Sequence, residues 1–353
     1  MSGRGDRLAA LLDERELDCL LVTNLVNVRW LTGFTGTNGA CLITPEERLF
    51  FTDFRYVDLA SVQVRDFERV EVGRDLLGDV AARLRGRAGF DDFDVSVQTH
   101  GKLAAKAGDG VELVPAGRLV ERLRAVKDEN ELRAMRAAAG IADAAYQDIR
   151  ERGLIGRTER EVALSAARFM EDRGAEGPAF PPIVAAAANG ARPHAVPGDA
   201  EIEAGTLVVI DMGAKVDGYC SDCTRTFATG SPAEDLLKVY ELVRRAQAEA
   251  RAAVRAGAIC SDVDAVARGI IEAEGHGERF GHGLGHGVGL EVHEQPRLAR
   301  TAEGSLAAGN TVTVEPGIYL PGRFGVRLED LVVVTEDGCE ALTEFPKELV
   351  TVH

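Results

Sequence analysis

Residues 206–228 read TLVVIDMGAKVDGYCSDCTRTFA, with two β-like runs on either side of the dipeptide Asp217-Gly218. This dipeptide between apolar strands is a strong signal for a tight hairpin turn. A turn centred on it makes Asp211 and Asp222 diagonal neighbours, and a turn centred one residue earlier places them directly opposite each other. Either register puts both side chains on one face of the hairpin, about 5 to 8 Å apart. The two carboxylates would repel each other there unless they are solvated or share a cation.

A second pair of carboxylates occurs in a second predicted hairpin. The stretches VEPGIYL and GVRLEDL flank a turn that contains Pro-Gly, and Glu315 and Glu329 can share a face of this hairpin unless a bulge shifts the register. Glu315 lies among apolar strand residues, where an ionised carboxylate is costly unless it is paired or bound to a metal. This second pair therefore favours a cation site over two solvated aspartates.

Glycine occupies every second position from 281 to 289 in a third stretch, GHGLGHGVGLEVHE at 281–294, which contains His282, His286 and His293. Its glycines let the main chain approach a ligand closely. The stretch lacks the phosphate-binding patterns G-x-G-x-x-G and G-x-x-x-x-G-K-[ST], and HEQPR at 293–297 lacks the second histidine of H-E-x-x-H. Because alternate residues of an extended chain share a face, we expect a strand that presents some of these imidazoles to one cavity.

The four carboxylates and the nearby histidines form a ligand set that is dominated by oxygen, with one or two nitrogens. Divalent cations such as Mn²⁺ and Co²⁺ prefer such a set, and four negative charges would neutralise two of these cations. Two metal ions about 3.5 to 4 Å apart would generate a hydroxide and polarise a carbonyl group. The pattern therefore indicates a site for two divalent metal ions.

The length of the chain and its pattern of expected strands and helices predict two domains. The chain has 353 residues, which exceeds the size at which one hydrophobic core usually stops growing. Short apolar strands alternate with helical stretches up to about residue 120, as in an α/β domain. Later helices and β-rich stretches fall in separate blocks, as in an α+β domain. We therefore expect an α/β N-terminal domain at residues 1–123 and an α+β domain at residues 124–353.

Helices of the second domain carry predicted start and stop signals. Thr158 and Glu161 form a capping box before one helix, and Ser231 and Glu234 form a similar signal before the next. Gly275 follows a helix that begins near Ser261.

Composition excludes several classes of function. The net charge of −16 argues against a surface for nucleic acid or anionic membrane, since both attract basic residues. The N-terminus has no apolar signal peptide and the chain has no run of about 18 apolar residues, so we expect a cytoplasmic protein. The six scattered cysteines are expected to be reduced thiols.

These motifs resemble those of the metallopeptidase family that contains aminopeptidase P, prolidase and methionine aminopeptidase, whose catalytic domain has the pita-bread fold. The matching stretches are IDMG around Asp211, SDCTRTF around Asp222, GHGLGHGVGL with HE downstream, VEPG around Glu315 and RLED around Glu329. WLTGFTGTNGA at 30–40 is similar to the N-terminal domain of the proline-specific branch, the creatinase/prolidase-like domain.

The resemblance also implies roles for individual residues. It implies a dinuclear metal site with the five ligands Asp211, Asp222, His286, Glu315 and Glu329. It further implies that His194, in ARPHAVPG, and His293 hydrogen-bond the substrate and stabilise the tetrahedral intermediate. A homodimer is the oligomeric state that the resemblance suggests.

We expect from this resemblance an Xaa-Pro aminopeptidase, which cuts between an N-terminal residue and a following proline. The metal ions are expected to be Mn²⁺, with Co²⁺ and Zn²⁺ as alternatives, and Glu315 is expected to carry the proton to the leaving proline nitrogen. An Xaa-Pro dipeptidase (prolidase) is the alternative peptidase, and a metal-free relative that acts as a binding module is an alternative of another class. A methionine aminopeptidase is disfavoured because those relatives generally lack a separate N-terminal domain.

Two side chains near the predicted site have open roles. Arg297 is either a surface arginine or the partner of a substrate carboxylate, for which the planar guanidinium is suited. His282 is expected to pack or to support the site rather than to react.

Overall fold

The computed structural model describes residues 3–353, which form two compact units, one that ends at Arg124 and one from Ala125 to His353. The first is an α/β unit and the second an α+β unit, as the sequence predicts. No helix in this described part of the chain is long and apolar enough to cross a membrane.

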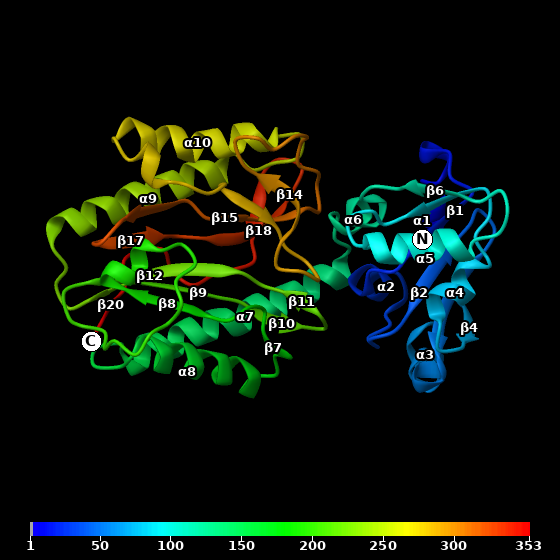
Figure 1. The fold of residues 1–353 in the computed structure, drawn as a ribbon. Coiled ribbons are helices and arrows are strands. Elements are labelled where there is room, and N and C mark those ends of the chain that lie inside the picture. Colours follow the sequence, from blue (N-terminus) through cyan, green and yellow to red (C-terminus); the bar gives the residue numbers. More distant parts are fainter. Residues whose placement is uncertain (1–2) are drawn as a thin grey trace. The chain divides into compact units, whose positions relative to one another are not determined.

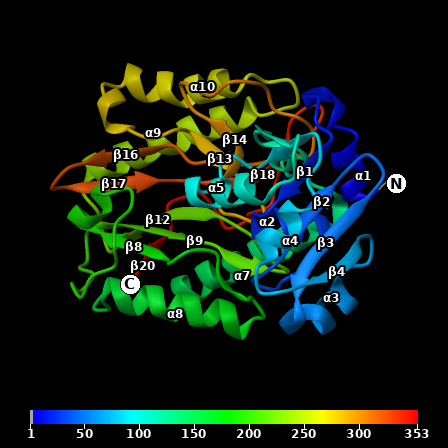
Figure 2. The ribbon, with the colours of Figure 1, turned by 45° about the vertical axis from the view of Figure 1, so that its right-hand side comes forward.

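The first unit is built on one mixed β-sheet, whose strands are Cys19–Val22 (β1), Ala40–Ile43 (β2), Arg48–Asp53 (β3), Glu68–Val72 (β4), Arg87–Phe90 (β5) and Glu112–Pro115 (β6). Their order in the sheet is β4-β3-β2-β1-β5-β6, and Figure 2 shows β2, β3 and β4 side by side. Its helices are Arg4–Ala9 (α1), Leu25–Thr32 (α2), Val57–Gln63 (α3), Leu76–Ala81 (α4), Val97–Lys106 (α5) and Leu119–Arg124 (α6). Apolar side chains of α4 and α5 pack on the central strands.

The second unit contains four long helices, Glu129–Arg152 (α7), Glu159–Asp172 (α8), Glu234–Ala252 (α9) and Cys260–Ala273 (α10), within residues 125–353. Its first group of strands is Gly177–Pro178 (β7), Ile183–Ala186 (β8), Leu207–Met212 (β9), Ala214–Val216 (β10), Tyr219–Cys220 (β11) and Cys223–Thr229 (β12). Its second group is Gly285–Gly287 (β13), Glu294–Leu298 (β14), Thr311–Val314 (β15), Gly317–Leu320 (β16), Phe324–Arg327 (β17), Asp330–Val334 (β18), Cys339–Ala341 (β19) and Thr351–Val352 (β20).

The strands of this unit lie between two pairs of helices (Figure 1). α7 and α8 bury Tyr146 and Met170 against Ile210 and Phe227 of the sheet β20-β12-β9-β8. α9 and α10 form a second core with β15 and β18 of the sheet β14-β13-β15-β18-β19. Helices cover one face of each of these two sheets. The other face of each sheet is therefore available to form a site.

The first predicted hairpin forms with its turn on Asp217-Gly218. Both residues have positive φ, 50° and 82°, as a two-residue turn between antiparallel strands requires. Val216 pairs with Tyr219 at the turn, and Thr224 pairs with Asp211 further along. The observed register is therefore the one that makes Asp211 and Asp222 diagonal neighbours.

The second predicted hairpin places its two glutamates opposite each other. Val314 pairs with Asp330 in the ladder of β15 and β18, and Gly317 pairs with Arg327 in the ladder of β16 and β17. The register is the same in both ladders, so Glu315 and Glu329 stand directly opposite each other between them. The predicted shared face is confirmed.

The helix signals differ in their outcome. Thr158 caps α8 through the predicted box, since its side chain accepts a hydrogen bond from Glu161 N while the Glu161 carboxylate accepts one from Thr158 N. The signal assigned to Ser231 is wrong, because α9 begins after Ala233 without a side-chain cap. Gly275, with φ of 78°, follows α10 as predicted.

Two glycines of the glycine-rich segment lie where the main chain is crowded. Gly285 and Gly287 belong to β13, which pairs with β14 on one side and with β15 on the other. A Cβ atom would lie 2.0 Å from the carbonyl oxygen of Thr313 at the first position, and 2.2 Å from the carbonyl oxygen of Gln295 at the second. These glycines are needed for close packing of the strands around His286.

This crowding predicts that Gly285→Ala destabilises the fold by about 1 to 3 kcal/mol, the usual cost of an overpacked site. Gly281→Ala is the matched control in the same segment, since no atom of residues 3–353 beyond its chain neighbours lies within 4 Å of an added Cβ. Urea unfolding of both variants measures the difference. Equal midpoints for the two variants would contradict this account of the glycines.

Candidate metal centre

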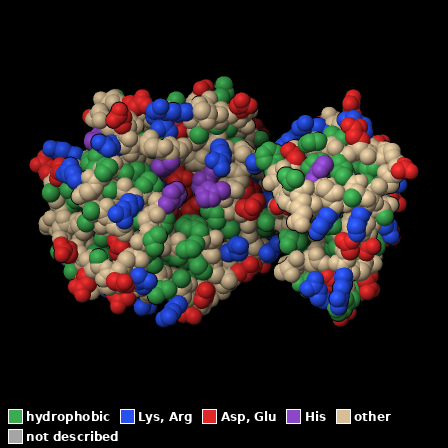
Figure 3. Space-filling view, in the orientation of Figure 1, with side chains coloured by type: hydrophobic (Ala, Val, Ile, Leu, Met, Phe, Trp, Pro, Cys, Tyr) green, Lys and Arg blue, Asp and Glu red, His purple; other side chains and the backbone are tan. Residues whose placement is uncertain are grey.

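One cavity of about 560 Å³ in the second unit brings together the predicted site residues. Figure 3 shows a hollow with histidine side chains gathered round acidic ones. The residues that line the cavity include Asp211, Asp222, His286, Glu315, Glu329, His194, His293 and Arg297. Segments that lie far apart in the sequence therefore meet at one place.

The five expected ligands come from both groups of strands. Asp211 lies on β9, and Asp222 immediately precedes β12. His286 is the central residue of β13, while Glu315 and Glu329 lie between the two ladders of the second hairpin. Each ligand residue thus lies in a strand or directly next to one, and this position fixes the direction of its side chain.

Three of these side chains converge closely enough to hold one ion. Ligand atoms of Asp222, His286 and Glu329 all lie within 4.8 Å of one another. Nε2 of His286 is 3.2 Å from Oε1 of Glu315 and 3.7 Å from Oδ2 of Asp222. Carboxylate oxygens with one imidazole nitrogen suit a divalent cation of the Mn²⁺ or Co²⁺ type.

Three carboxylate oxygens in this cavity lack a hydrogen-bond partner within residues 3–353. They are Oδ1 of Asp211, Oδ1 of Asp222 and Oε1 of Glu329, and all three are buried. A buried acceptor without a partner is costly, so native proteins rarely leave one without an ion or water. The residues present therefore fit a bound cation.

The electrostatics of the carboxylates support the same conclusion. Burial, together with the charge of neighbouring carboxylates, raises the pKa of Asp222 and Glu329 well above their ordinary values. Burial also raises the pKa of Asp211. Burial opposes ionisation of Glu315 as well, but the hydrogen bond and charge of His286 outweigh it and lower the pKa of Glu315 to about 2. Four ionised carboxylates in one buried place require added positive charge.

Arg327 supplies part of that charge and was not among the predicted site residues. Its buried guanidinium donates to Oδ2 of Asp211 at 2.6 Å and, through Nε, to Oγ1 of Thr224 at 2.9 Å. Thr224 in turn donates to Oε2 of Glu329 at 2.7 Å. Asp211 and Glu329 thus each have one oxygen held by the protein and the other left open to a cation. The sequence signal was the arginine two residues before Glu329 in RLED.

His282 lies in the wall of the same cavity rather than in an apolar core. Nδ1 faces the carbonyl oxygen of Gly283 at 2.7 Å, so it carries the proton, and Nε2 accepts from the hydroxyl of Tyr319 at 2.9 Å. The Tyr319 oxygen accepts from Arg327 at 2.9 Å. A chain of hydrogen bonds therefore runs from Gly283 to Arg327, in agreement with a supporting role for His282.

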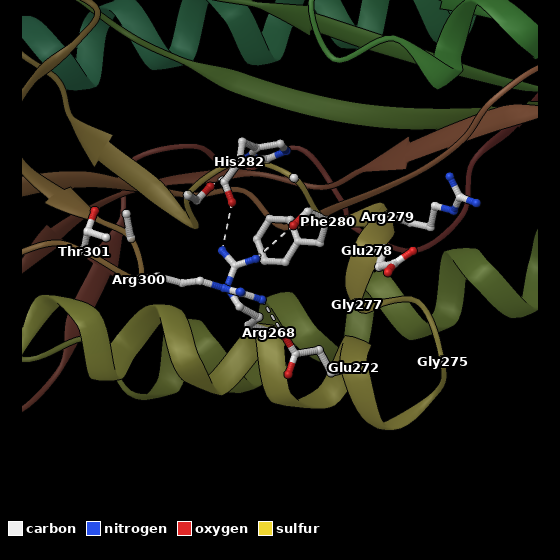
Figure 4. A pocket seen from close by; sticks show the side chains of 13 residues that line it. Arg268, Glu272, Gly275, Gly277, Glu278, Arg279, Phe280, His282, Arg300 and Thr301 are labelled. Carbon is white, nitrogen blue, oxygen red and sulfur yellow. Dashed lines mark hydrogen bonds and ion pairs between the residues drawn. The ribbon is translucent and has the colours of Figure 1, made fainter.

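His282 also lines a second pocket, shown in Figure 4, where Arg268 of α10 fixes the main chain. Its guanidinium donates to the carbonyl oxygens of Phe280 and His282 at 2.9 and 2.8 Å, and pairs with Asp264 through two contacts of 2.7 Å. Asp264 also accepts from the amide of Leu284. The glycine-rich segment is therefore anchored just before it enters β13.

The remaining predicted residues lie at the rim of the cavity, where His194, His293 and Arg297 are exposed. The rings of His293 and His286 are 4.3 Å apart between centroids. Arg297 of β14 is the direct cross-strand partner of His286, and such partners project from the same face of a sheet. Its guanidinium is thus on the cavity side of the strand rather than on an unrelated surface.

Comparisons with known proteins agree with this architecture. Residues 133–336 match the model of metallopeptidase family M24, and residues 4–126 match that of the creatinase/prolidase N-terminal domain. The chain is 35% identical to the Xaa-Pro dipeptidase of Pyrococcus furiosus, over 99% of this chain and 100% of that protein. The solved structure of an Xaa-Pro dipeptidase from Bacillus anthracis has a TM-score of 0.96 at 39% identity, with 99% of both chains covered. An X-Pro aminopeptidase from Thermotoga maritima has a TM-score of 0.90 at 35% identity, with 99% of this chain and 100% of that chain covered.

These matches confirm the family and the pita-bread architecture that the motifs predict. They also show a peptidase of a class that uses divalent metal ions. The dipeptidases among the relatives favour the Xaa-Pro dipeptidase alternative over the Xaa-Pro aminopeptidase that the sequence analysis placed first.

The open oxygens of the cavity predict that Asp222→Asn loses bound metal, because the variant removes one of the charges that offset the cations. Asp217→Asn is the control, since it makes the same change at the exposed turn of the same hairpin. Elemental analysis after loading with Mn²⁺ and gel filtration measures the ions per chain. An Asp222→Asn protein that retains as many ions as the control would remove Asp222 from the ligand set.

Proposed function

The chain belongs to metallopeptidase family M24, and on that premise we propose that it is a metal-dependent Xaa-Pro dipeptidase. It cuts the bond between an N-terminal residue and a C-terminal proline. The observation that carries this choice is the place of Arg297, directly across the strand pair from His286 and at the rim of the cavity. A dipeptide carries its carboxylate one residue beyond the cut bond, where a guanidinium can bind it through two hydrogen bonds.

In this proposal two divalent cations are held by Asp211, Asp222, His286, Glu315 and Glu329. Mn²⁺ is the proposed metal, with Co²⁺ and Zn²⁺ as alternatives, because the donor set is mostly oxygen. When bound, such ions lower the pKa of water and polarise a carbonyl oxygen. The partnerless oxygens of Asp211, Asp222 and Glu329 support this assignment.

The protein's own groups perform the remaining tasks. Glu315, which lines the cavity beside His286, accepts a proton from the attacking water and delivers it to the leaving proline nitrogen. His194 and His293 line the cavity and come from two different segments of the chain. Imidazole N–H groups there donate to the oxyanion that develops on the scissile carbonyl.

The apolar part of the cavity lining supports a small substrate with an apolar ring. Phe180, Ile183 and Val292 form part of its wall beside the ligands. An apolar wall accommodates the proline ring and the side chain before it, while the rim provides polar contacts for the two ends of the dipeptide.

We also propose that the protein forms a homodimer and that it is located in the cytoplasm.

A second candidate is an Xaa-Pro aminopeptidase that acts on longer peptides. The likeness to the X-Pro aminopeptidase of Thermotoga maritima favours it, as does the exposure of Arg297 at the rim rather than at a closed end of the cavity.

The two candidate histidines predict a separation of chemistry from metal binding. His194→Ala and His293→Ala should each lower kcat on an Xaa-Pro dipeptide by about 10²-fold or more, the usual loss for an oxyanion donor. Metal content should stay near that of the unaltered protein. His276→Ala, which changes a histidine outside the cavity lining, is the control. Loss of metal in either variant would reassign that histidine as a ligand.

The test of the proposed function is substrate length. The Mn²⁺-loaded enzyme should hydrolyse Xaa-Pro dipeptides with a higher kcat/KM than matched Xaa-Pro-Yaa tripeptides. Arg297→Ala should raise KM for the dipeptides about ten-fold or more, because a charge-assisted hydrogen bond contributes about 1.5 to 3 kcal/mol. Tripeptides should change much less, since they present an amide at that position.

Arg300→Ala is the matched control, because Arg300 is an exposed arginine three residues further on that pairs with Glu272 instead. Equal small effects of Arg297→Ala on both substrates, with preference for the tripeptide, would favour the aminopeptidase. Lack of hydrolysis of either substrate would overturn both candidates.

A further inference from the structure

Glu159, the first residue of α8, is a buried carboxylate that lies outside the cavity of the metal ligands. Its exposed fraction is 3%. Oε1 accepts a hydrogen bond from the amide of Ala186 at 2.7 Å, and Oε2 accepts from Nδ2 of Asn189 at 2.8 Å and from the amide of Gly198 at 2.9 Å. All three donors belong to one segment, residues 186–198, which leads from the end of β8 to the rim of the cavity.

This segment carries His194. The imidazole is exposed, so its position depends on the main chain that presents it more than on packing around the ring. Glu159 holds that main chain near both ends, at Ala186 and at Gly198. Arg327 holds it in the middle, where Nη1 donates to the carbonyl oxygen of Pro193 at 3.1 Å.

The start of the segment has a conformation that needs support. Ala187 has φ of 46°, in the left-handed region that a residue with a Cβ rarely adopts. It follows Ala186, whose amide is bound by Glu159, and it opens a short 3₁₀ helix, Ala187–Ala191, which also contains Asn189. Such strained residues persist where surrounding contacts fix them. Two of the three residues that donate to Glu159, Ala186 and Asn189, lie within two positions of Ala187.

From these contacts we propose that Glu159 is a positioning residue for His194. It holds the segment 186–198 so that the imidazole of His194 reaches the scissile carbonyl. The inference rests on the proposed function, since it assigns Glu159 an effect on the reaction through a histidine of that same site.

The test is a double-mutant cycle with Glu159→Gln, which keeps the size of the side chain but presents an amide NH₂ group to N–H donors. The variant should lower kcat on an Xaa-Pro dipeptide at least ten-fold with little change in KM or in metal content. In the His194→Ala background the same change should have almost no further effect, because residues that act through each other are not additive. In the His293→Ala background it should retain its full effect.

Glu161→Gln is the matched control. Glu161 lies on the same turn of α8 and accepts hydrogen bonds from the amide and the hydroxyl of Thr158, so it tests a general loss of helix stability. Asn189→Ala removes one hydrogen bond to Glu159. It replaces Glu159→Gln in the double-mutant cycle if that variant fails to fold. A loss of kcat that is equal in the unaltered and His194→Ala backgrounds would overturn the proposal.

Amide hydrogen exchange provides a readout that does not depend on catalysis. Glu159→Gln should speed exchange in residues 186–198 at least ten-fold and leave the strands of the metal ligands unchanged, whereas Glu161→Gln should leave this segment unaltered. Unchanged exchange in the segment would overturn the proposal. An unaltered protein that shows no hydrolysis, together with faster exchange in Glu159→Gln, would refute the proposed function while leaving Glu159 as the anchor of the segment.

Discussion

The repulsion between four carboxylates in one buried place is the constraint on which the second unit depends. Asp211, Asp222, Glu315 and Glu329 cannot all be ionised there without positive charge, as the raised pKa values of Asp222 and Glu329 indicate. The protein offsets part of the repulsion with the buried guanidinium of Arg327, which pairs with Asp211. Three carboxylate oxygens remain without a partner within residues 3–353. Cations bound at these oxygens would offset the rest of the repulsion. A site of this kind is stable only if the framework around it prevents the carboxylates from moving apart.

That framework is a set of strands with fixed register and a second layer of buried charge. Asp330 follows Glu329 and points to the opposite face of the strand, where it is fully buried and pairs with Arg225, Arg251 and Lys347. Arg225 also donates to the main-chain oxygen of Glu329. Breaking such a buried pair leaves an uncompensated charge, so these contacts resist displacement of the strand. The ligand side chains therefore extend from a rigid base.

The residues proposed to act on substrate are held differently. His194, His293 and Arg297 lie at the rim and are exposed, and the main chain around His194 is held by hydrogen bonds to Glu159 and Arg327. The metal ligands are held rigidly, whereas the rim is held by only a few polar contacts. The site can therefore meet two different requirements. The metal ligands must stay together against repulsion, whereas the rim must admit and release a peptide.

The sequence by itself determined both hairpins, the shared faces of the two carboxylate pairs and the family, because turn chemistry and the period of two along a strand are local properties. It did not determine which of two registers the first hairpin adopts, nor where α9 begins, since Ser231 offers a capping pattern that the chain does not use. Only the tertiary structure showed Arg327 bonded to Asp211, the direction of Arg297 and the contacts of Glu159 with a segment 27 to 39 residues away. Those contacts join strands and loops that are distant in the chain, and neither periodicity nor spacing encodes which distant residues will meet.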